Sequence, residues 1–223
     1  MKRILLLMTL VVGASCSVWA DTACPLGGSP TADLATYIAG GFSCSVGDLT
    51  FSNFGYIPTP AVGGAIAPSA AEIGVTPIFG TEMGLEFTAD WAVGPGQSED
   101  SPITYTVTCD GCSIDDVVLS STGGALGTGV ASIAETGGPV NLFNAYGGGL
   151  LLNSQTDDLT PPVTTLSLTK DIGVTGGTTG IAHISVVNNL FSTNTTTVPE
   201  PSAVFLCMGL LGLVPVARRK FGF

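Results

Sequence analysis

Apolar and polar residues alternate along much of the middle of the chain, a pattern typical of half-buried β-strands. Three stretches show one alternating set most clearly: Leu85, Phe87, Ala89 and Trp91; Ile103, Tyr105, Val107 and Cys109; and Leu166, Leu168, Lys170 and Ile172. The same reasoning predicts further strands at 48–56, 113–120, 129–135, 149–153 and 181–191. The middle of the chain is therefore predicted to be β-structure throughout.

Segments rich in Gly and Pro separate these strands. The predicted breaks are 57–68, 94–102, 123–129, 137–139, 147–149, 160–162 and 173–180. With 31 Gly and 14 Pro in 223 residues, long helices have little room; residues 31–40, with Thr31 as cap and Gly40 as stop, are the best exception. About eight short strands with frequent turns predict an all-β fold, an antiparallel, jelly-roll-like β-sandwich.

Asp110-Gly111 is a strong two-residue turn signal between two of the predicted strands. It predicts that 103–109 and 113–120 pair as a hairpin.

Both ends of the chain differ from this middle. Lys2-Arg3 and the apolar run 4–14 form a charged region and a hydrophobic core typical of a secretory signal peptide. Val18-Trp19-Ala20 supplies small residues for signal peptidase, so we expect cleavage between Ala20 and Asp21. Lipidation at Cys16 is the weaker alternative, because Gly13 stands where a lipoprotein signal needs a large aliphatic residue.

The other end combines three features in order. Val198 precedes Pro199-Glu200-Pro201, residues 203–217 are apolar and uncharged, and Arg218, Arg219 and Lys220 follow. The apolar run would span roughly 22 Å as a helix, short of a bilayer core of about 30 Å. The basic tail would hold its far end in the cytoplasm. Residues alone leave an ordinary C-terminal membrane anchor open.

That order resembles the PEP-CTERM sorting signal of Gram-negative bacteria, and the resemblance covers about a tenth of the chain. It implies that exosortase cuts near Pro199-Glu200-Pro201 in the inner membrane and that the ectodomain then reaches the cell surface or the medium. The expected organisation is a signal peptide at 1–20, a β-sandwich ectodomain at 21–191, a Thr-rich linker at 192–198 and the sorting signal at 199–223, with a transmembrane helix at 203–217. In the linker, Asn194-Thr195-Thr196 fits a glycosylation sequon, although a plain solvated linker is favoured.

Trimming both ends changes the charge balance. Residues 21–198 hold sixteen acidic residues and one cation, Lys170, a formal charge of −15. Such a domain repels nucleic acid and anionic membranes, so neither is an expected partner.

Four cysteines remain in the expected ectodomain, and an even number in an oxidising compartment indicates two disulfides. Three connectivities are open; we favour Cys24–Cys44 and Cys109–Cys112. A redox Cys-x-x-Cys site at Cys109 is disfavoured because strand follows it rather than a helix start. A four-thiolate zinc site is disfavoured because Cys24 and Cys44 are not closely spaced.

Candidate catalytic groups are few. His183 is the only histidine, and no Gly-x-Ser-x-Gly or Gly-Lys-Ser motif accompanies it. Four acidic pairs could serve glycoside hydrolysis or bind calcium; they are Glu82/Glu86, Glu99/Asp100, Asp115/Asp116 and Asp157/Asp158. We expect no catalytic residues, no metal site and no cofactor, with one structural calcium as the alternative.

The expected function is structural or adhesive, at the cell surface or in an exopolysaccharide matrix, a role that the PEP-CTERM resemblance implies. A carbohydrate- or calcium-binding surface module is the alternative, and a secreted hydrolase comes third.

Overall fold

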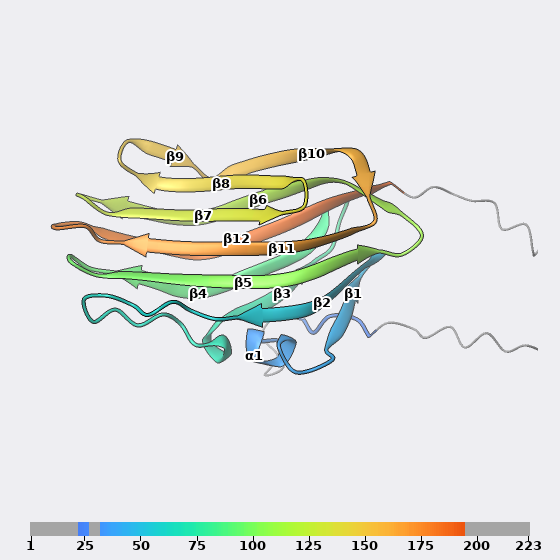
Figure 1. Ribbon diagram of the computed structural model, residues 1–223, viewed down its shortest axis with the longest axis horizontal. Helices are drawn as coiled ribbons and strands as arrows, with labels where there is room; N and C mark the ends of the chain where they lie inside the picture. Colours follow the sequence, from blue (N-terminus) through green and yellow to red (C-terminus); the bar gives the residue numbers. More distant parts are fainter. Residues whose placement is uncertain (1–21, 27–31, 195–223) are drawn as a thin grey trace, which may run out of the picture.

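The computed structural model describes residues 22–26 and 32–194, and these form two antiparallel β-sheets packed face to face (Figure 1). One sheet has seven strands in the order β1-β2-β5-β11-β7-β8-β9, and the other has five in the order β10-β6-β12-β4-β3. The predicted all-β antiparallel sandwich is confirmed at this level. The expected signal peptide, the sorting signal with its helix at 203–217, and residues 195–198 of the linker lie outside the described residues. The expected start of the linker at 192 is wrong, because residues 192–194 continue β12 (Ile181–Asn194) and pair with β6.

The strands of the seven-stranded sheet are β1 (Ser43–Val46), β2 (Leu49–Tyr56), β5 (Ser98–Cys109), β7 (Val130–Gly137), β8 (Val140–Gly147), β9 (Leu150–Leu152) and β11 (Thr165–Thr175). Those of the five-stranded sheet are β3 (Gly74–Ile78), β4 (Met83–Val93), β6 (Ser113–Leu126), β10 (Ser154–Val163) and β12 (Ile181–Asn194). A short 3₁₀ helix, η1 (Ala70–Glu72), precedes β3.

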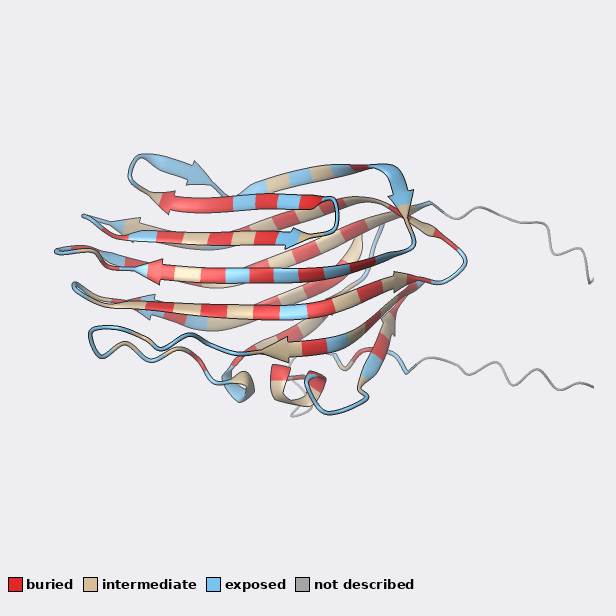
Figure 2. Cartoon of the chain, viewed as in Figure 1, coloured by how far each residue is buried: buried red, intermediate tan, exposed pale blue. Residues whose placement is uncertain are grey.

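The inward-facing residues of the alternating strands form a core between the two sheets. Along β11, Leu166, Leu168, Lys170, Ile172 and Val174 are all buried, while the residues between them are exposed or half-buried. Figure 2 shows the same banding of buried and exposed positions along the long strands of both layers. Removing these apolar side chains from water is the main stabilisation of such a sandwich.

The described part of the chain has twelve strands, and several are longer than expected. Strands β1, β3, β8 and β10 were not predicted as such. Five predicted breaks are partly strand: 94–102 by β5, 123–129 by β6 and 173–180 by β11, and, by one residue each, 137–139 by β7 and 147–149 by β8. The break at 160–162 lies within β10, where a register shift separates Asp158 from Val163. Prolines are tolerated there because β10 is an edge strand.

Pro102 explains why 98–102 was predicted wrongly as a break. Asp100 O accepts from Thr59 N, and Ser98 N donates to Val62 O, so the even-numbered backbone groups of this stretch face the 57–68 segment. The missing N–H of Pro102 therefore faces the side away from β11, and the pairing of Pro102 with Asp171 on β11 continues.

The predicted hairpin between 103–109 and 113–120 is wrong. Strand β5 pairs with β2 and β11 in one sheet, whereas β6 pairs with β10 and β12 in the other. The turn at Asp110-Gly111 therefore crosses between sheets, with Gly111 at φ 73°. Turn residues specify a reversal of the chain, and the hydrogen-bond partners available to each strand decide whether the reversal makes a hairpin or a corner.

The predicted helix at 31–40 is reduced to one turn, α1 (Leu34–Tyr37). Its N-cap is Asp33, whose side chain accepts from Thr36 N at 2.8 Å, and not Thr31, which lies outside the described residues. Leu34 and Tyr37 are fully buried, so packing of this one apolar side holds the turn.

Candidate functional site

The most unusual feature of the described chain is a set of polar side chains buried between the sheets. Lys170 on β11 and Glu135 on β7 stand directly opposite each other in the register and form an ion pair, and both side chains are fully buried. Glu135 Oε2 contacts Lys170 Nζ, while Glu135 Oε1 has no hydrogen-bond partner. A buried ion pair is costly to desolvate, so its presence in this core requires explanation.

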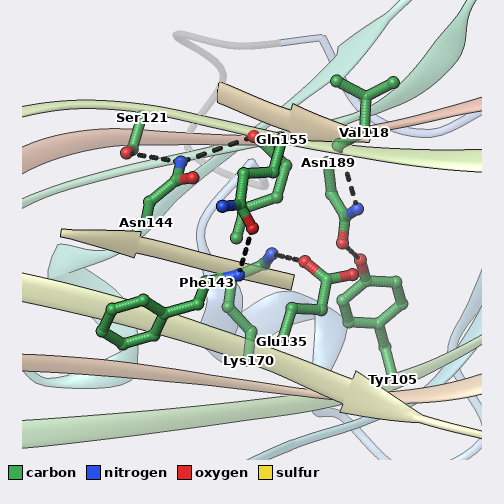
Figure 3. A network of polar contacts seen from close by, with 10 residues as sticks. Tyr105, Val118, Ser121, Glu135, Phe143, Asn144, Gln155, Lys170 and Asn189 are labelled. Atoms are coloured by element: carbon green, nitrogen blue, oxygen red, sulfur yellow. Dashed lines mark hydrogen bonds and ion pairs between the residues drawn. The ribbon is translucent and has the colours of Figure 1, made fainter. Parts of the chain in front are cut away.

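Two further buried groups lie beside this pair, as Figure 3 shows. The Tyr105 hydroxyl on β5 donates to Asn189 Oδ1 on β12, across the space between the sheets. Asn189 Nδ2 in turn donates to Val118 O at 3.4 Å. These bonds link the two layers through polar groups in an otherwise apolar interior.

The electrostatics of the pair follow from its burial. Burial lowers the pKa of Lys170, and the charge of Glu135 and its hydrogen bond oppose that shift. Burial raises the pKa of Tyr105 well above its usual range, and the Glu135 carboxylate raises it further, so the phenol stays protonated. The Glu135 carboxylate and the phenol are therefore close enough to interact.

A second buried polar cluster lies further along the same seam. Asn144 on β8 donates to Ser121 Oγ at 2.9 Å and to Leu119 O at 3.4 Å, and Tyr146 donates to Ser121 O at 2.7 Å. This cluster joins β8 to β6 across the sandwich (Figure 3 shows its Asn144–Ser121 contact). Its groups satisfy one another's hydrogen-bonding capacity and leave only Asn144 Oδ1 without a partner.

Glu99, near the start of β5, is 4% exposed and turned inward. Neither carboxylate oxygen has a partner in hydrogen-bonding geometry. Burial raises the pKa of Glu99 to about 7, the Asp90 charge adds to this, and the nearby Ala92 backbone opposes it. The group is therefore partly protonated at neutral pH.

A surface groove of about 260 Å³ lies on the outer face of the seven-stranded sheet, between β5, β7 and β11. Asp100, Ser132 and Gly173 contribute to its lining, and Thr59 Oγ1 approaches Asp100 Oδ2 at 3.3 Å. Asp171 lies next to it; burial raises the pKa of Asp171 to about 6, and the hydrogen bond and charge of Asp100 add to the rise.

The structure separates most of the residues that the sequence offered as candidates for catalysis or calcium binding. Glu99 and Asp100 point to opposite faces of β5 because neighbours in a strand alternate. Asp157 Oδ2 accepts from Asn141 N at 3.0 Å, and Asp115 Oδ1 accepts from Ser113 Oγ at 3.2 Å, so two of the acidic pairs have structural contacts. His183 is exposed on β12, opposite Gly124.

Several predicted features concern groups of residues rather than single side chains. Among the described residues, no group of three or more His, Cys, Asp or Glu side chains is arranged to hold a metal ion. Within those same residues, no helix is long and apolar enough to cross a membrane. The residues predicted for processing and sorting lie outside the described part of the chain; they are Ala20, Asp21, Val198, Pro199, Glu200, Pro201, Arg218, Arg219 and Lys220.

The four cysteines of the described residues form the two disulfides that the sequence favoured. Cys24–Cys44 ties the N-terminal segment to β1, and Cys109–Cys112 closes the corner between β5 and β6. All four are buried.

Sequence reasoning did not find Glu135, Tyr105 and Asn189 as a set. One signal was present: Lys170 occupies an apolar position in the alternation of β11, which places a cation in the core and requires an anion nearby. Which carboxylate forms the ion pair with Lys170 depends on which strands are neighbours.

Comparisons with known proteins add little. No protein-family model matches the chain, and no curated protein matches it. Among solved structures, the enzymatically active domain of tailspike protein 4 of bacteriophage CBA120 is similar at 16% identity, with a TM-score of 0.23. That match covers 73% of this chain and 22% of the phage chain, and at such a TM-score it carries no argument.

Proposed function

We propose that this chain is an exported protein that exosortase processes at its C-terminal signal and that serves a structural or adhesive role in an exopolysaccharide matrix or at the cell surface. The observation that carries this proposal is where the charges lie. Lys170 is the only Lys or Arg of the described residues, and it forms a buried ion pair with Glu135 in the core. The charged side chains on the exterior of this part of the chain are therefore all acidic, on a sandwich held by two disulfides.

This arrangement suits a passive surface component better than an enzyme. A uniformly anionic exterior keeps molecules soluble and apart, and disulfides resist unfolding outside the cell. A secreted hydrolase ranks third, because His183 is the only histidine of the sequence and no Gly-x-Ser-x-Gly motif accompanies it.

The finer organisation belongs to the same proposal. Residues 1–20 act as the signal peptide, 195–198 as what remains of the linker beyond β12, and 203–217 as a membrane helix that is present only before processing. We also assign the sandwich to the jelly-roll type, because β4, β5 and β6 alternate between the sheets and β10, β11 and β12 do so again.

Processing is tested by intact mass and C-terminal sequencing of the protein from its own host, in cell-bound and released fractions. A C-terminus between Val198 and Ser202 in an exosortase-bearing host is the expected result. An intact Phe223 in the membrane fraction of that host would contradict the proposal, and the protein would then be an ordinary anchored domain.

The groove beside Asp100 and Asp171 favours one alternative, a carbohydrate- or calcium-binding module. Carboxylates and hydroxyls of this kind bind sugars and hard cations. Retention on the host's own polysaccharide, with and without calcium, distinguishes the two: a binding module is retained and loses retention in Asp100→Asn/Asp171→Asn, whereas a passive matrix component shows no such dependence on these two residues.

A further inference from the structure

The buried Lys170–Glu135 pair places the two reactants of an amide bond in contact inside the core. Nζ of Lys170 touches Oε2 of Glu135, both side chains have no exposed surface, and the residues are direct cross-strand partners on β11 and β7. Holding two reacting groups in contact is equivalent to an effective concentration on the order of 10⁵–10⁸ M.

The surroundings disfavour the ionised form of this pair. The inward neighbours Leu168 and Ile172 on β11, and Ile133 on β7, are all buried and apolar. In such an environment two charges are costly, and proton transfer from the ammonium to the carboxylate yields a neutral amine beside a neutral carboxylic acid. A neutral amine is the nucleophilic form of lysine, and burial already lowers the pKa of Lys170.

We propose that Lys170 and Glu135 condense to a side-chain amide, so that an intramolecular isopeptide bond joins β11 to β7 in the mature protein. In the reaction, the Lys170 ammonium first gives one proton to Glu135. The Nζ lone pair then forms a bond to Cδ, the bond from Cδ to one carboxyl oxygen breaks, and that oxygen leaves as water with the transferred proton and a second proton from Nζ. Nothing is oxidised or reduced, and both buried charges disappear.

Two observations bear on how the carboxyl group reacts. Oε2 is the oxygen in contact with Nζ, so Oε2 takes the transferred proton and leaves as water, and Oε1, which has no hydrogen-bond partner, becomes the carbonyl oxygen of the amide. The Tyr105 phenol, whose pKa the Glu135 carboxylate raises, interacts with the same group while its hydroxyl is held by Asn189. Because the Tyr105 hydroxyl donates to Asn189, it makes no hydrogen bond to the Glu135 carboxyl group.

The bond would reinforce a part of the sandwich that the disulfides leave unsupported. Cys24–Cys44 and Cys109–Cys112 constrain the N-terminal segment and the β5–β6 corner. An amide between 135 and 170 would close the segment that contains β8, β9 and β10 and tie its ends across adjacent strands. Such a cross-link resists reduction, which a disulfide does not.

The test uses a property of the sequence. Lys170 is the only Lys or Arg between residues 4 and 217, so trypsin acting on the reduced, denatured mature protein can cut its interior only there. Amide formation removes the lysine charge that trypsin recognises. We expect the full chain, expressed with its export signals and recovered from the oxidising compartment, to have a mass lower by one water than its sequence requires and to resist trypsin at 170.

Glu135→Leu is the matched control, because it leaves Lys170 unmodified and should restore both the sequence mass and the cut. Digestion is done on the denatured chain, so the result does not depend on whether the variant folds. Fragmentation after cleavage at acidic residues should yield a branched peptide that joins the segment containing Glu135 to the segment containing Lys170.

An unmodified mass with ready cleavage after Lys170 would overturn the proposal. A mass lower by one ammonia, with a branch at Asn189 or Asn144, would also overturn it, since the lysine would then be acylated by an amide side chain and not by Glu135. Neither result bears on exosortase processing, which is read at the C-terminus.

Discussion

Glu99 shows how one residue sets the pH dependence of stability. The carboxyl has an ordinary pKa near 4.5 when exposed, and burial raises it to about 7 in the folded protein. Between these values the folded state binds more protons than the unfolded state, so the free energy of unfolding falls as pH rises and levels off above about pH 7. Asp171, raised to about 6, acts in the same direction.

Glu99→Gln should therefore flatten this pH dependence, because glutamine is neutral throughout. We expect the wild-type protein to lose on the order of 1–2 kcal/mol between pH 5 and pH 8, less than the full shift implies, since solvent screens part of the charge. Urea unfolding at both pH values measures the effect. Asp48→Asn, at an exposed turn, controls for removing one negative charge; an unchanged slope in Glu99→Gln would contradict the assignment.

Tyr105 and Asn189 form a polar link between the sheets, and removing the Tyr105 hydroxyl should cost less once Asn189 has been replaced. Tyr105→Phe leaves Asn189 Oδ1 buried without its donor, which we expect to destabilise the protein by about 1–3 kcal/mol. In the Asn189→Leu background the same change should cost clearly less, because no acceptor is left unpaired. Equal costs in the two backgrounds, measured by urea unfolding, would show that the contact contributes nothing.

At the level of elements, β10 protects the open edge of β8. Strand β9 pairs with β8 only over residues 145–147, so the rest of that edge of β8 lacks a neighbouring strand. Two side chains of β10 accept hydrogen bonds from backbone N–H groups on this edge: Asp157 Oδ2 accepts from Asn141 N at 3.0 Å, and Gln155 Oε1 accepts from Phe143 N at 2.9 Å. Unpaired strand edges promote association with other chains, and we expect this capping to oppose it.

Gln155→Ala/Asp157→Ala should open that edge. We expect faster hydrogen exchange at the amides of Asn141 and Phe143 and self-association at high protein concentration, because the freed N–H groups can donate to the carbonyl groups of another strand. Exchange mass spectrometry and size-exclusion chromatography read the two effects. Thr156→Ala, between the two positions, should leave both unchanged, and exchange at the wild-type rate in the double variant would rule out the capping role.

At the scale of the whole molecule, charge is unbalanced outside and neutralised inside. The described residues carry fifteen acids and one lysine, and that lysine is in the core. The exterior therefore repels itself, and this repulsion opposes the compact state.

Salt should therefore stabilise the protein. Screening shortens the range of the repulsion from about 30 Å at 0.01 M ionic strength to about 8 Å at 0.15 M. We expect the melting temperature to rise by a few degrees over this range of sodium chloride. A melting temperature that falls with salt would mean that attractive surface contacts outweigh the repulsion.

The sequence alone determined what depends on local order. Alternation such as that of Leu166, Leu168, Lys170 and Ile172 identified the inward face of β11, because the side chains of a strand alternate whatever its neighbours are. Cysteine number and spacing indicated the two disulfides, and composition indicated an anionic exterior.

Only the tertiary structure decided which strands are neighbours, and everything that depends on pairing followed from that. The Asp110-Gly111 turn became a corner between sheets because β5 pairs with β2 and β11 and not with β6. Lys170 meets Glu135 because β11 lies against β7, 35 residues earlier, in a register that places the two opposite each other. Long-range pairing is set by the packing of the whole core, and no local pattern encodes it.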